Sequence, residues 1–475
     1  MVFSSTLFLL YFFPLFLLVY YLADTKYKNA VILFFSICFY MWGAPRFVIV
    51  ILASVILDYY LSHSIYNAEG KKKNILLIFS VCINIGVLLY FKYANFFVDN
   101  INTLLYNFGA SGPIKWTAIA LPIGISFFTF HELSYIIDVY RGVNKPMKRI
   151  IDYAVYILLF PQLIAGPIIR YKEIANQIID RHHQETIDNK LTGFFRFVIG
   201  LSKKVLIANV LGEQVDIIFA MAPTDVSTYL AWIGIVAYSF QIYFDFSGYS
   251  DMAIGIARMI GIIFPENFDN PYISRNITEF WRRWHISLSR WMRDYLYIPL
   301  GGNKVKTKAR LYFNLWLVFI ISGLWHGAAW SFIIWGAFHG LFLVADRLFL
   351  LKITERIGKI PSMFLTYFIV LIGWVFFRSE TLEYSANFLS IMFGFSKTNN
   401  FPLMDFKFYF ILILAGIFSF SGVFNRIHNI QNFVLYRSPS VSQTFVFSIS
   451  CIALLILCIG SIASSGFNPF IYFRF

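Results

Sequence analysis

Charged residues are scarce in this sequence, and their scarcity excludes an ordinary soluble protein. Only 13% of the 475 residues are Asp, Glu, Lys or Arg, whereas 59% are hydrophobic and 20% are aromatic. A water-soluble core cannot hide that much apolar surface. The composition therefore indicates an integral membrane protein, and long apolar runs without strand alternation predict that it is all-α.

Acidic residues are rarer than basic ones. The chain has 39 Lys and Arg against 25 Asp and Glu, a formal net charge of +14. The excess could suggest nucleic acid, but the basic residues fall in short loops between apolar runs, mainly at Lys71–Lys73, Lys145–Arg149 and Arg275–Arg310. Such loops orient a membrane protein with its basic side toward the cytoplasm. We therefore predict membrane lipid as a partner, no nucleic acid, and an N-terminus that starts outside.

Cysteine is also scarce, and so are signs of separate domains. All four cysteines lie inside apolar segments, and none has the spacing of metal ligands. No soluble domain, internal repeat or low-complexity linker is visible. We therefore expect no metal, and we predict one polytopic membrane domain over residues 1–475 with a catalytic core over residues 120–345.

Apolar runs recur from Ser5 to Ile462, but several are shorter than the about 20 residues that a full crossing needs. The segment Phe160–Tyr171 contains two prolines and a glycine that cannot all fit one regular helix. A break of this kind survives in a bilayer only where it lines a cavity. We predict about eleven transmembrane helices, together with re-entrant and interfacial helices.

One histidine stands inside an otherwise uninterrupted apolar stretch, Ser322–Gly340. His326 is flanked by Gly323 and Gly327, which we expect to let either backbone or a substrate approach the imidazole closely. His339 lies about 220° further round if the helix is continuous, so we interpret it as structural. His326 is our strongest catalytic candidate.

A second histidine lies in the most aromatic and basic stretch, Ile277–Asn303. Aromatic and apolar residues recur there at helical spacing and predict one helix at the membrane surface, with His285 on its apolar face. The opposite face is basic and carries Arg282, Arg283, Arg290 and Arg293. This predicted helix therefore places a titratable imidazole beside a cationic surface.

Two carboxylates interrupt the apolar run before this stretch. Asp245 and Asp251 lie on either side of Ser247–Gly248, where we predict a break between two helices. The simpler interpretation is that they cap the second helix and neutralise arginines of the stretch Arg282–Arg293. We prefer it to a direct chemical role.

Five segments together resemble one protein family. They are FPQLIAGPIIRY at Phe160–Tyr171, FDFSGYSDMAIGIARM at Phe244–Met259, the stretch Glu266–Asn303, SGLWHGAAW at Ser322–Trp330 and NPFIYFRF at Asn468–Phe475. In this order they resemble the membrane-bound O-acyltransferase family, and within it the alginate O-acetyltransferase branch with its related cell-wall and exopolysaccharide acetyltransferases.

The resemblance implies a polytopic helical fold around a central tunnel in the bacterial cytoplasmic membrane. It implies that acetyl-CoA enters from the cytoplasm and that the acceptor is a hydroxyl of an extracytoplasmic polysaccharide, reached directly or through a secreted or membrane-anchored SGNH-type partner. By the same resemblance His326 is catalytic and His285 lines the tunnel nearby.

The chemistry of acyl transfer agrees with these residues. A neutral imidazole can take the proton of the acceptor hydroxyl, and a second polar group, His285 with Asn276 or a backbone N–H, can polarise the thioester carbonyl. Spacing does not decide which histidine does which task. For the phosphates of the donor we predict a cofactor-binding set of Arg282, Arg283, Arg290 and Arg293, with Trp281 and Asn276 beside them. The alternative is that the arginines bind anionic lipid and fix the topology.

Two other functions stay open from the sequence. A membrane transporter would move its substrate unchanged, and the absence of an inverted repeat disfavours it. Another member of the same enzyme class would transfer a different group, such as D-alanine to teichoic acid or a long acyl chain to lipid or protein.

Overall fold

The computed structural model describes residues 1–109, 112–394, 396, 398, 404–424, 426, 429, 440–466 and 471. Every regular element in these ranges is helical, and no strand occurs in them. The predicted all-α class is therefore confirmed. Of the C-terminal motif Asn468–Phe475, only Ile471 lies within the described residues.

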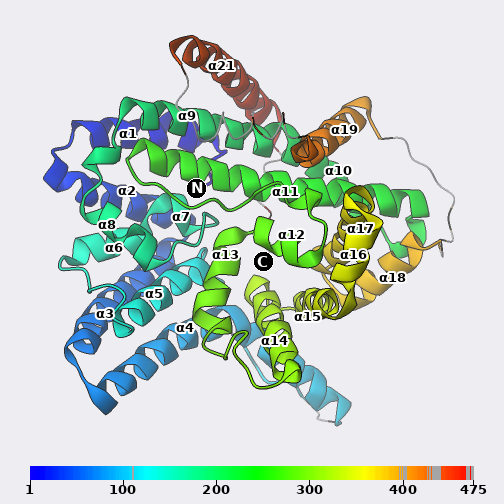
Figure 1. Ribbon diagram of the computed structural model, residues 1–475, viewed down its shortest axis with the longest axis horizontal. Helices are drawn as coiled ribbons and strands as arrows, with labels where there is room; N and C mark the ends of the chain where they lie inside the picture. The colour runs from blue at the N-terminus through cyan, green and yellow to red at the C-terminus, as the bar shows by residue number, and fades with distance from the viewer. Residues whose placement is uncertain are drawn as a thin grey trace. The chain divides into compact units, whose positions relative to one another are not determined.

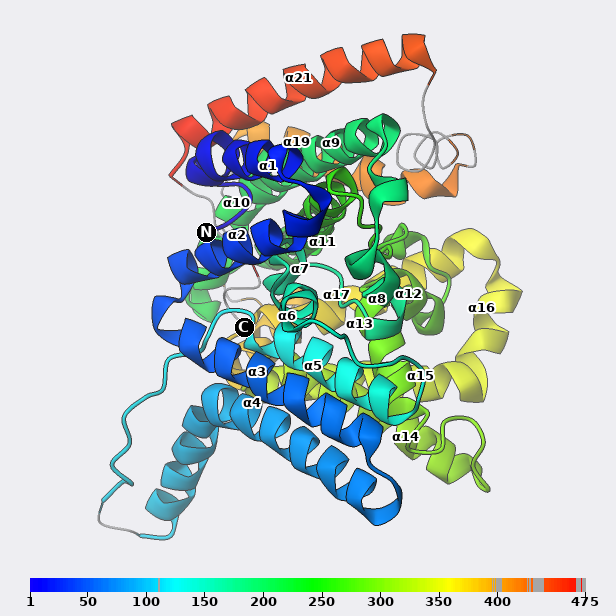
Figure 2. The ribbon, with the colours of Figure 1, turned by 90° about the vertical axis from the view of Figure 1, so that its left-hand side faces the viewer.

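The chain divides into two compact units, one of Met1 with Phe13–His183 and the other of Val2–Phe12 with Gln184–Phe475. The helices of the first unit are α1 Phe13–Leu22, α2 Lys28–Gly43, α3 Val48–Asn67, α4 Gly70–Asn107, α5 Ile125–Tyr140, α6 Ile150–Leu158, α7 Phe160–Leu163 and α8 Tyr171–Ile179. Within this unit α3 packs against both α4 and α5, and the three helices lie side by side in Figure 2.

The predicted break near Phe160–Tyr171 is confirmed in this first unit. Helix α6 ends at Leu158, the four-residue α7 follows, and the backbone then stays irregular until α8 begins at Tyr171. A side chain on Gly166 would lie 2.6 Å from the carbonyl oxygen of Pro161, so the tight path requires glycine there. The break is buried throughout, as a non-helical segment at membrane depth must be.

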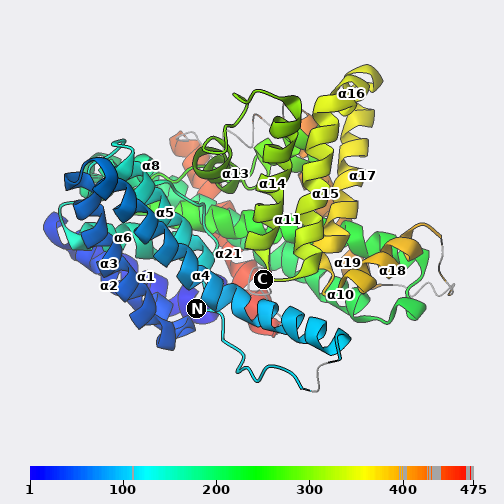
Figure 3. The same cartoon turned by 90° about the horizontal axis from the view of Figure 1, so that it is seen from below.

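The second unit holds the histidines of interest. Its α-helices are α9 Ile187–Ser202, α10 Asn209–Ala220, α11 Thr228–Met259, α12 Ile277–Arg283, α13 Ile286–Met292, α14 Lys308–His326, α15 Trp330–Ala345, α16 Leu351–Ile357, α17 Lys359–Arg378, α18 Leu382–Met392, α19 Phe406–Phe420 and α21 Val441–Ser464. Figure 3 shows α14, α15 and α17 side by side, and α15 packs against both of the others.

Helix α11 is continuous for 32 residues, so the predicted break at Ser247–Gly248 is wrong. Its glycines serve close packing against α9, which runs beside it in Figure 1. A Cβ on Gly248 would lie 2.7 Å from the carbonyl oxygen of Gly200, and a Cβ on Gly255 would lie 2.6 Å from that of Gly193. Two pairs of glycines thus bring the backbones of the two helices into contact.

Six helical segments in the described part of the chain are long and apolar enough to cross a membrane. They are Pro45–Asn67, Gly70–Asn107, Trp330–Ile357, Lys359–Arg378, Phe406–Val423 and Val441–Ser464. The predicted membrane protein is confirmed, whereas the number of about eleven crossings and the central tunnel stay predictions.

Candidate active site

The aromatic and basic stretch is not the single helix that its periodicity predicts. Helix α12 ends at Arg283, α13 begins at Ile286, and His285 between them has φ +44°, in the left-handed region. The cause is a contact with a preceding loop, because the backbone N–H of Ile286 donates to the carbonyl oxygen of Asn267 at 3.0 Å. Residues that looked like one helical face are therefore divided between two short helices.

His285 is completely buried at this break. Its ring lies edge-on to Phe246 of α11, with centroids 4.7 Å apart, and 6.1 Å from the ring of Trp325. Its Nδ1 lies 3.0 Å from the side-chain oxygen of Asn267. The residue is outside the six candidate spans, and burial lowers the pKa of His285 to about 3. The imidazole is therefore neutral near pH 7.

His326 is the last residue of α14 and is 5% exposed. Its ring lies 4.8 Å from that of Trp325, 5.0 Å from that of Trp335 and 5.1 Å from that of Phe377. Trp325 thus contacts both candidate histidines, and their ring centroids are no farther apart than the sum of the two distances to its indole. The structure brings the two predicted histidines into one aromatic cluster.

His339 belongs to the same cluster, although the segment that carries it is not one continuous helix. Helix α14 ends at His326 and α15 begins at Trp330, so the predicted angle between His326 and His339 does not apply. Both rings contact Trp335, and the indole N–H of Trp281 donates to Nδ1 of His339 at 3.4 Å. Trp281, predicted to bind the donor, is buried in this aromatic packing.

The glycines beside His326 admit neighbouring protein atoms rather than a substrate, which decides between the two alternatives that the sequence left open for them. A Cβ on Gly327 would overlap the ring of Phe332, and a Cβ on Gly323 would overlap the carbonyl oxygen of the same residue. Helices α14 and α15 therefore lie against each other where the chain reverses. Their close contact fixes the position of His326 at the end of α14.

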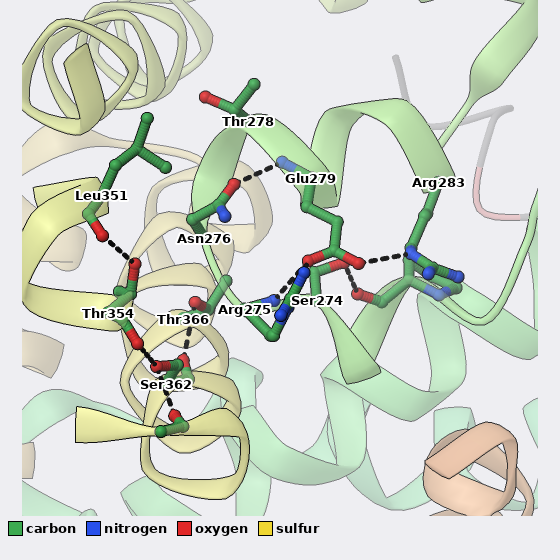
Figure 4. Close-up of polar contacts among 12 residues, drawn as sticks. Ser274, Arg275, Asn276, Thr278, Glu279, Arg283, Leu351, Thr354, Ser362 and Thr366 are labelled. Atoms are coloured by element: carbon green, nitrogen blue, oxygen red, sulfur yellow. Dashed lines mark hydrogen bonds and ion pairs between the residues drawn. The ribbon is translucent and has the colours of Figure 1, made fainter. Parts of the chain in front are cut away.

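The predicted donor-binding residues fall into two groups. Asn276 caps α12, since its side-chain oxygen accepts from the backbone N–H of Glu279 at 2.7 Å, and Arg283 pairs with the same Glu279 at 3.1 Å (Figure 4). Arg283 also pairs with Asp269 at 3.1 Å. These two residues are engaged in local structure.

The other three arginines of the set are exposed. Arg293 pairs with its neighbour Asp294 at 2.8 Å, whereas Arg282 and Arg290 form no ion pair with any residue that the structure describes. Their charges are therefore accessible to an anion from solution or from the membrane surface.

Asp245 and Asp251 do not neutralise the arginines of α12 and α13, contrary to the prediction. Asp251 binds Arg196 at 2.8 Å and Lys203 at 2.6 Å, and Asp245 binds Lys204 at 2.8 Å. All these cations follow α9 in sequence or lie on it. The carboxylates therefore join α11 through buried ion pairs to α9 and the π-helical turn that follows it, Lys203–Ala208, which together we call the α9 segment.

A cavity of about 720 Å³ lies beside this ion-pair network. Apolar side chains of the α9 segment, α11, α19 and α21 form most of its wall. Its polar lining includes Arg196, Lys203 and Asp251 of the network as well as Ser247, Ser250 and Asn267. Neither candidate histidine lines it, but Asn267 contacts His285 directly. The cavity therefore adjoins the histidine cluster through one side chain.

Elsewhere among the described residues, one group could hold a metal ion. The ligand atoms of Asp180, His182 and His183 all lie within 4.8 Å of one another, and the three residues are exposed. Such surface clusters are common without a metal, and this one carries no argument for catalysis.

Sequence reasoning missed Asn267 and Trp335. Asn267 lies three positions after the apolar run that ends at Phe264, in the motif ENFDNPY, and a polar residue there was a signal, but its partner His285 is 18 positions away. Trp335 resembles any other aromatic residue of an apolar helix. Only the fold shows that it contacts both His326 and His339.

Together these features define an all-helical membrane protein with two buried histidines, His285 and His326, beside the indole of Trp325. Comparison with known proteins then gives the family. The model of the family described as MBOAT, membrane-bound O-acyltransferase family, matches residues 138–377. The chain belongs to the membrane-bound O-acyltransferase family and is an O-acyltransferase.

Individual relatives extend this similarity over most of the chain. A probable alginate O-acetylase, AlgI, of Pseudomonas aeruginosa is 46% identical over 399 residues, covering 83% of this chain and 75% of the relative. The same-named protein of Azotobacter vinelandii is 40% identical over 505 residues and covers 100% of both chains. The peptidoglycan O-acetyltransferase of Helicobacter pylori is 36% identical over 428 residues, covering 83% of this chain and 80% of the relative.

Proposed function

We propose that this protein transfers acetyl groups from acetyl-CoA, at the cytoplasmic side of a bacterial cytoplasmic membrane, to hydroxyl groups of an extracytoplasmic polysaccharide. The observation that carries the proposal is the pair of buried histidines on either side of Trp325. The full-length similarity to proteins named as alginate O-acetylases supports acetyl as the group and a polysaccharide as the acceptor.

His326 acts as the base in this reaction. It takes the proton of the acceptor hydroxyl while the hydroxyl oxygen bonds to the thioester carbon and the carbon–sulfur bond breaks. The proton then passes to the sulfur, so that free CoA thiol is released. The aromatic walls around the ring exclude water, which would otherwise hydrolyse the thioester.

Exposed arginines bind the donor at the cytoplasmic surface. Arg282, Arg290 and Arg293 are accessible and close together in sequence, and the donor carries several phosphates. The acetyl group then reaches its polysaccharide directly or through an SGNH-type partner outside the membrane. An anionic lipid headgroup at the same arginines is the competing use.

The purified protein in detergent, supplied with acetyl-CoA and an alginate or peptidoglycan fragment, tests the proposal through the free thiol that it releases. His326→Ala should abolish release and leave the elution profile of the protein unchanged, while His182→Ala, a change of an exposed histidine, should keep the activity. Mass spectrometry of glycans from cells that express each variant gives the acceptor. Normal acetylation by His326→Ala, or movement of an unmodified substrate without thiol release, would contradict the proposal.

A further inference from the structure

Asn267 makes contacts that set the state of His285. It is completely buried. Its side-chain oxygen lies within hydrogen-bond distance of Nδ1 of His285 at 3.0 Å, the Ser287 backbone N–H at 3.3 Å and the Ser287 hydroxyl at 2.9 Å. Its own carbonyl oxygen accepts from Ile286. One asparagine thus contacts three consecutive residues at the break between α12 and α13.

The orientation of the Asn267 amide follows from these partners. A backbone N–H can only donate, so the atom that faces Ser287 must be the oxygen, because an amide NH₂ in that place would oppose one donor with another. The oxygen cannot donate in turn. The Nδ1 atom of His285, which shares this oxygen, must therefore carry a proton and donate it.

The tautomer of His285 follows in the same way. A neutral imidazole with its proton on Nδ1 has a lone pair on Nε2. This Nε2 is buried, and it has no hydrogen-bond partner among the residues that the structure describes. Besides Asn267, the ring contacts Phe246 from α11 and the indole of Trp325 from α14, and no acid or base in the described ranges is hydrogen bonded to it.

We propose that Asn267 is a positioning residue that holds His285 with its proton on Nδ1, so that the lone pair of Nε2 serves the acyl-transfer site as a hydrogen-bond acceptor, while the hydroxyl proton itself passes to His326. This role rests on the proposed acetyl transfer. It excludes the neutral His285 side chain as the donor that polarises the thioester oxygen, a task that the sequence left open to it.

The backbone at His285 supports a built site rather than an accident of packing. Left-handed φ angles are unusual for a residue with a side chain. In the described part of the chain, Asn270 is the only other non-glycine residue that has one. The contacts of Asn267 with Ile286 and Ser287 hold this conformation in place. They also stop α12 at the position that turns the imidazole toward Trp325.

Two substitutions of Asn267 test the role through the dependence of thiol release on pH. Asn267→Ala should lower kcat roughly 10- to 100-fold, since the tautomer is no longer fixed. Asn267→Asp keeps the acceptor oxygen but adds a negative charge, which favours the imidazolium form. It should regain activity at high pH and displace the acidic limb of the pH–rate profile upward by about one to three units.

Asn314 supplies the matched control. It is also fully buried, and its side chain donates to the carbonyl oxygen of Leu300 at 3.1 Å, away from either histidine. Asn314→Asp replaces a buried amide with a carboxylate just as Asn267→Asp does, but it does not touch either histidine. It should therefore leave both limbs of the pH–rate profile at the same pH as in the unchanged protein. An unshifted profile for Asn267→Asp, in protein that releases thiol normally, would overturn the role of Asn267 and leave the acetyl transfer intact.

A spectroscopic measurement addresses the same point without any activity. Protein with ring-¹⁵N-labelled histidine, compared with its His285→Gln variant, isolates the signals of His285 in solid-state NMR. At neutral pH they should show a protonated Nδ1 and an unprotonated Nε2, and Asn267→Ala should remove that pattern. A proton on Nε2 in the unchanged protein would refute the proposal.

Discussion

At the scale of single residues, an arginine is available to bind an anion only if its charge is not already used in an ion pair within the protein. Arg283 is held by Glu279 and Asp269, whereas Arg282 and Arg290 extend from the same short helices without an ion pair to any described residue. The four arginines look equivalent in sequence. The structure separates one that stabilises the break near His285 from those that are free to meet an anion.

Arg282→Ala and Arg290→Ala should therefore weaken the binding of acetyl-CoA and leave the stability of the protein unchanged. Each charge-assisted contact with a phosphate contributes about 1.5–3 kcal/mol, so KM should rise roughly 10- to 100-fold at low salt. Steady-state kinetics at two ionic strengths measure the effect. Arg283→Ala should instead lower Tm, and an unchanged KM in both other variants would favour the lipid role.

Burial of His285 also predicts how stability depends on pH. The folded pKa of about 3 lies below the ordinary value of 6.5, so the unfolded state binds the proton first as pH falls. Stability is therefore greatest above pH 6.5 and decreases progressively between pH 6.5 and 3, by about 2 kcal/mol at pH 5 from this residue alone. Thermal unfolding in detergent at pH 7 and pH 5 should show the loss. His285→Gln should reduce the difference, and an equal difference in both proteins would contradict the assignment.

At the scale of helices, the sequence predicts elements better than it predicts their partners. Helical spacing correctly marks the aromatic and basic stretch as helical, but the break at His285 depends on Asn267, which approaches from an earlier loop. In the same way, we expected Asp251 to neutralise arginines of the stretch Arg282–Arg293, but it binds Arg196, 55 positions before it. Local periodicity contains no information about such distant hydrogen bonds.

The contact between α9 and α11 gives a prediction at this scale. Gly200→Ala would place a Cβ 2.5 Å from the Gly248 carbonyl oxygen and 2.7 Å from the Met252 backbone nitrogen, atoms that cannot move aside independently. The variant should lose roughly 1–3 kcal/mol of stability through overpacking and lower the yield of folded protein. Gly460→Ala in α21 has open space around its Cβ and should behave like the unchanged protein. Thermal unfolding compares the two, and equal stability would disprove close contact.

For the whole molecule, composition and ordered motifs were sufficient to predict the all-α membrane class and the family, because both depend on properties spread over many residues. The pairing of His285 with His326 came from resemblance, and the structure supplies its physical form, the shared indole of Trp325. The number of crossings could not be obtained from apolar runs alone. Short helices such as α12 and α13 are buried by neighbours rather than by lipid, so their hydropathy does not reveal their depth.

The orientation of the chain in the membrane gives a final prediction about the whole molecule. Helix α4 has 38 residues, about 57 Å at 1.5 Å per residue, which exceeds the about 30 Å of the hydrocarbon core. From the basic residues at its start we predict that this end lies in the cytoplasm, so Phe108 just beyond its other end, 81% exposed, should face outside.

Single cysteines in a variant without the four native ones test this orientation. A membrane-impermeant thiol reagent should label Phe108→Cys from outside intact cells, and Lys72→Cys and Lys306→Cys only in inverted vesicles. Lys306 follows α13 in the basic stretch, so its labelling reports the side on which the donor arginines lie. Labelling of Lys306→Cys from outside would place those arginines away from cytoplasmic acetyl-CoA, and the donor would then have to bind elsewhere.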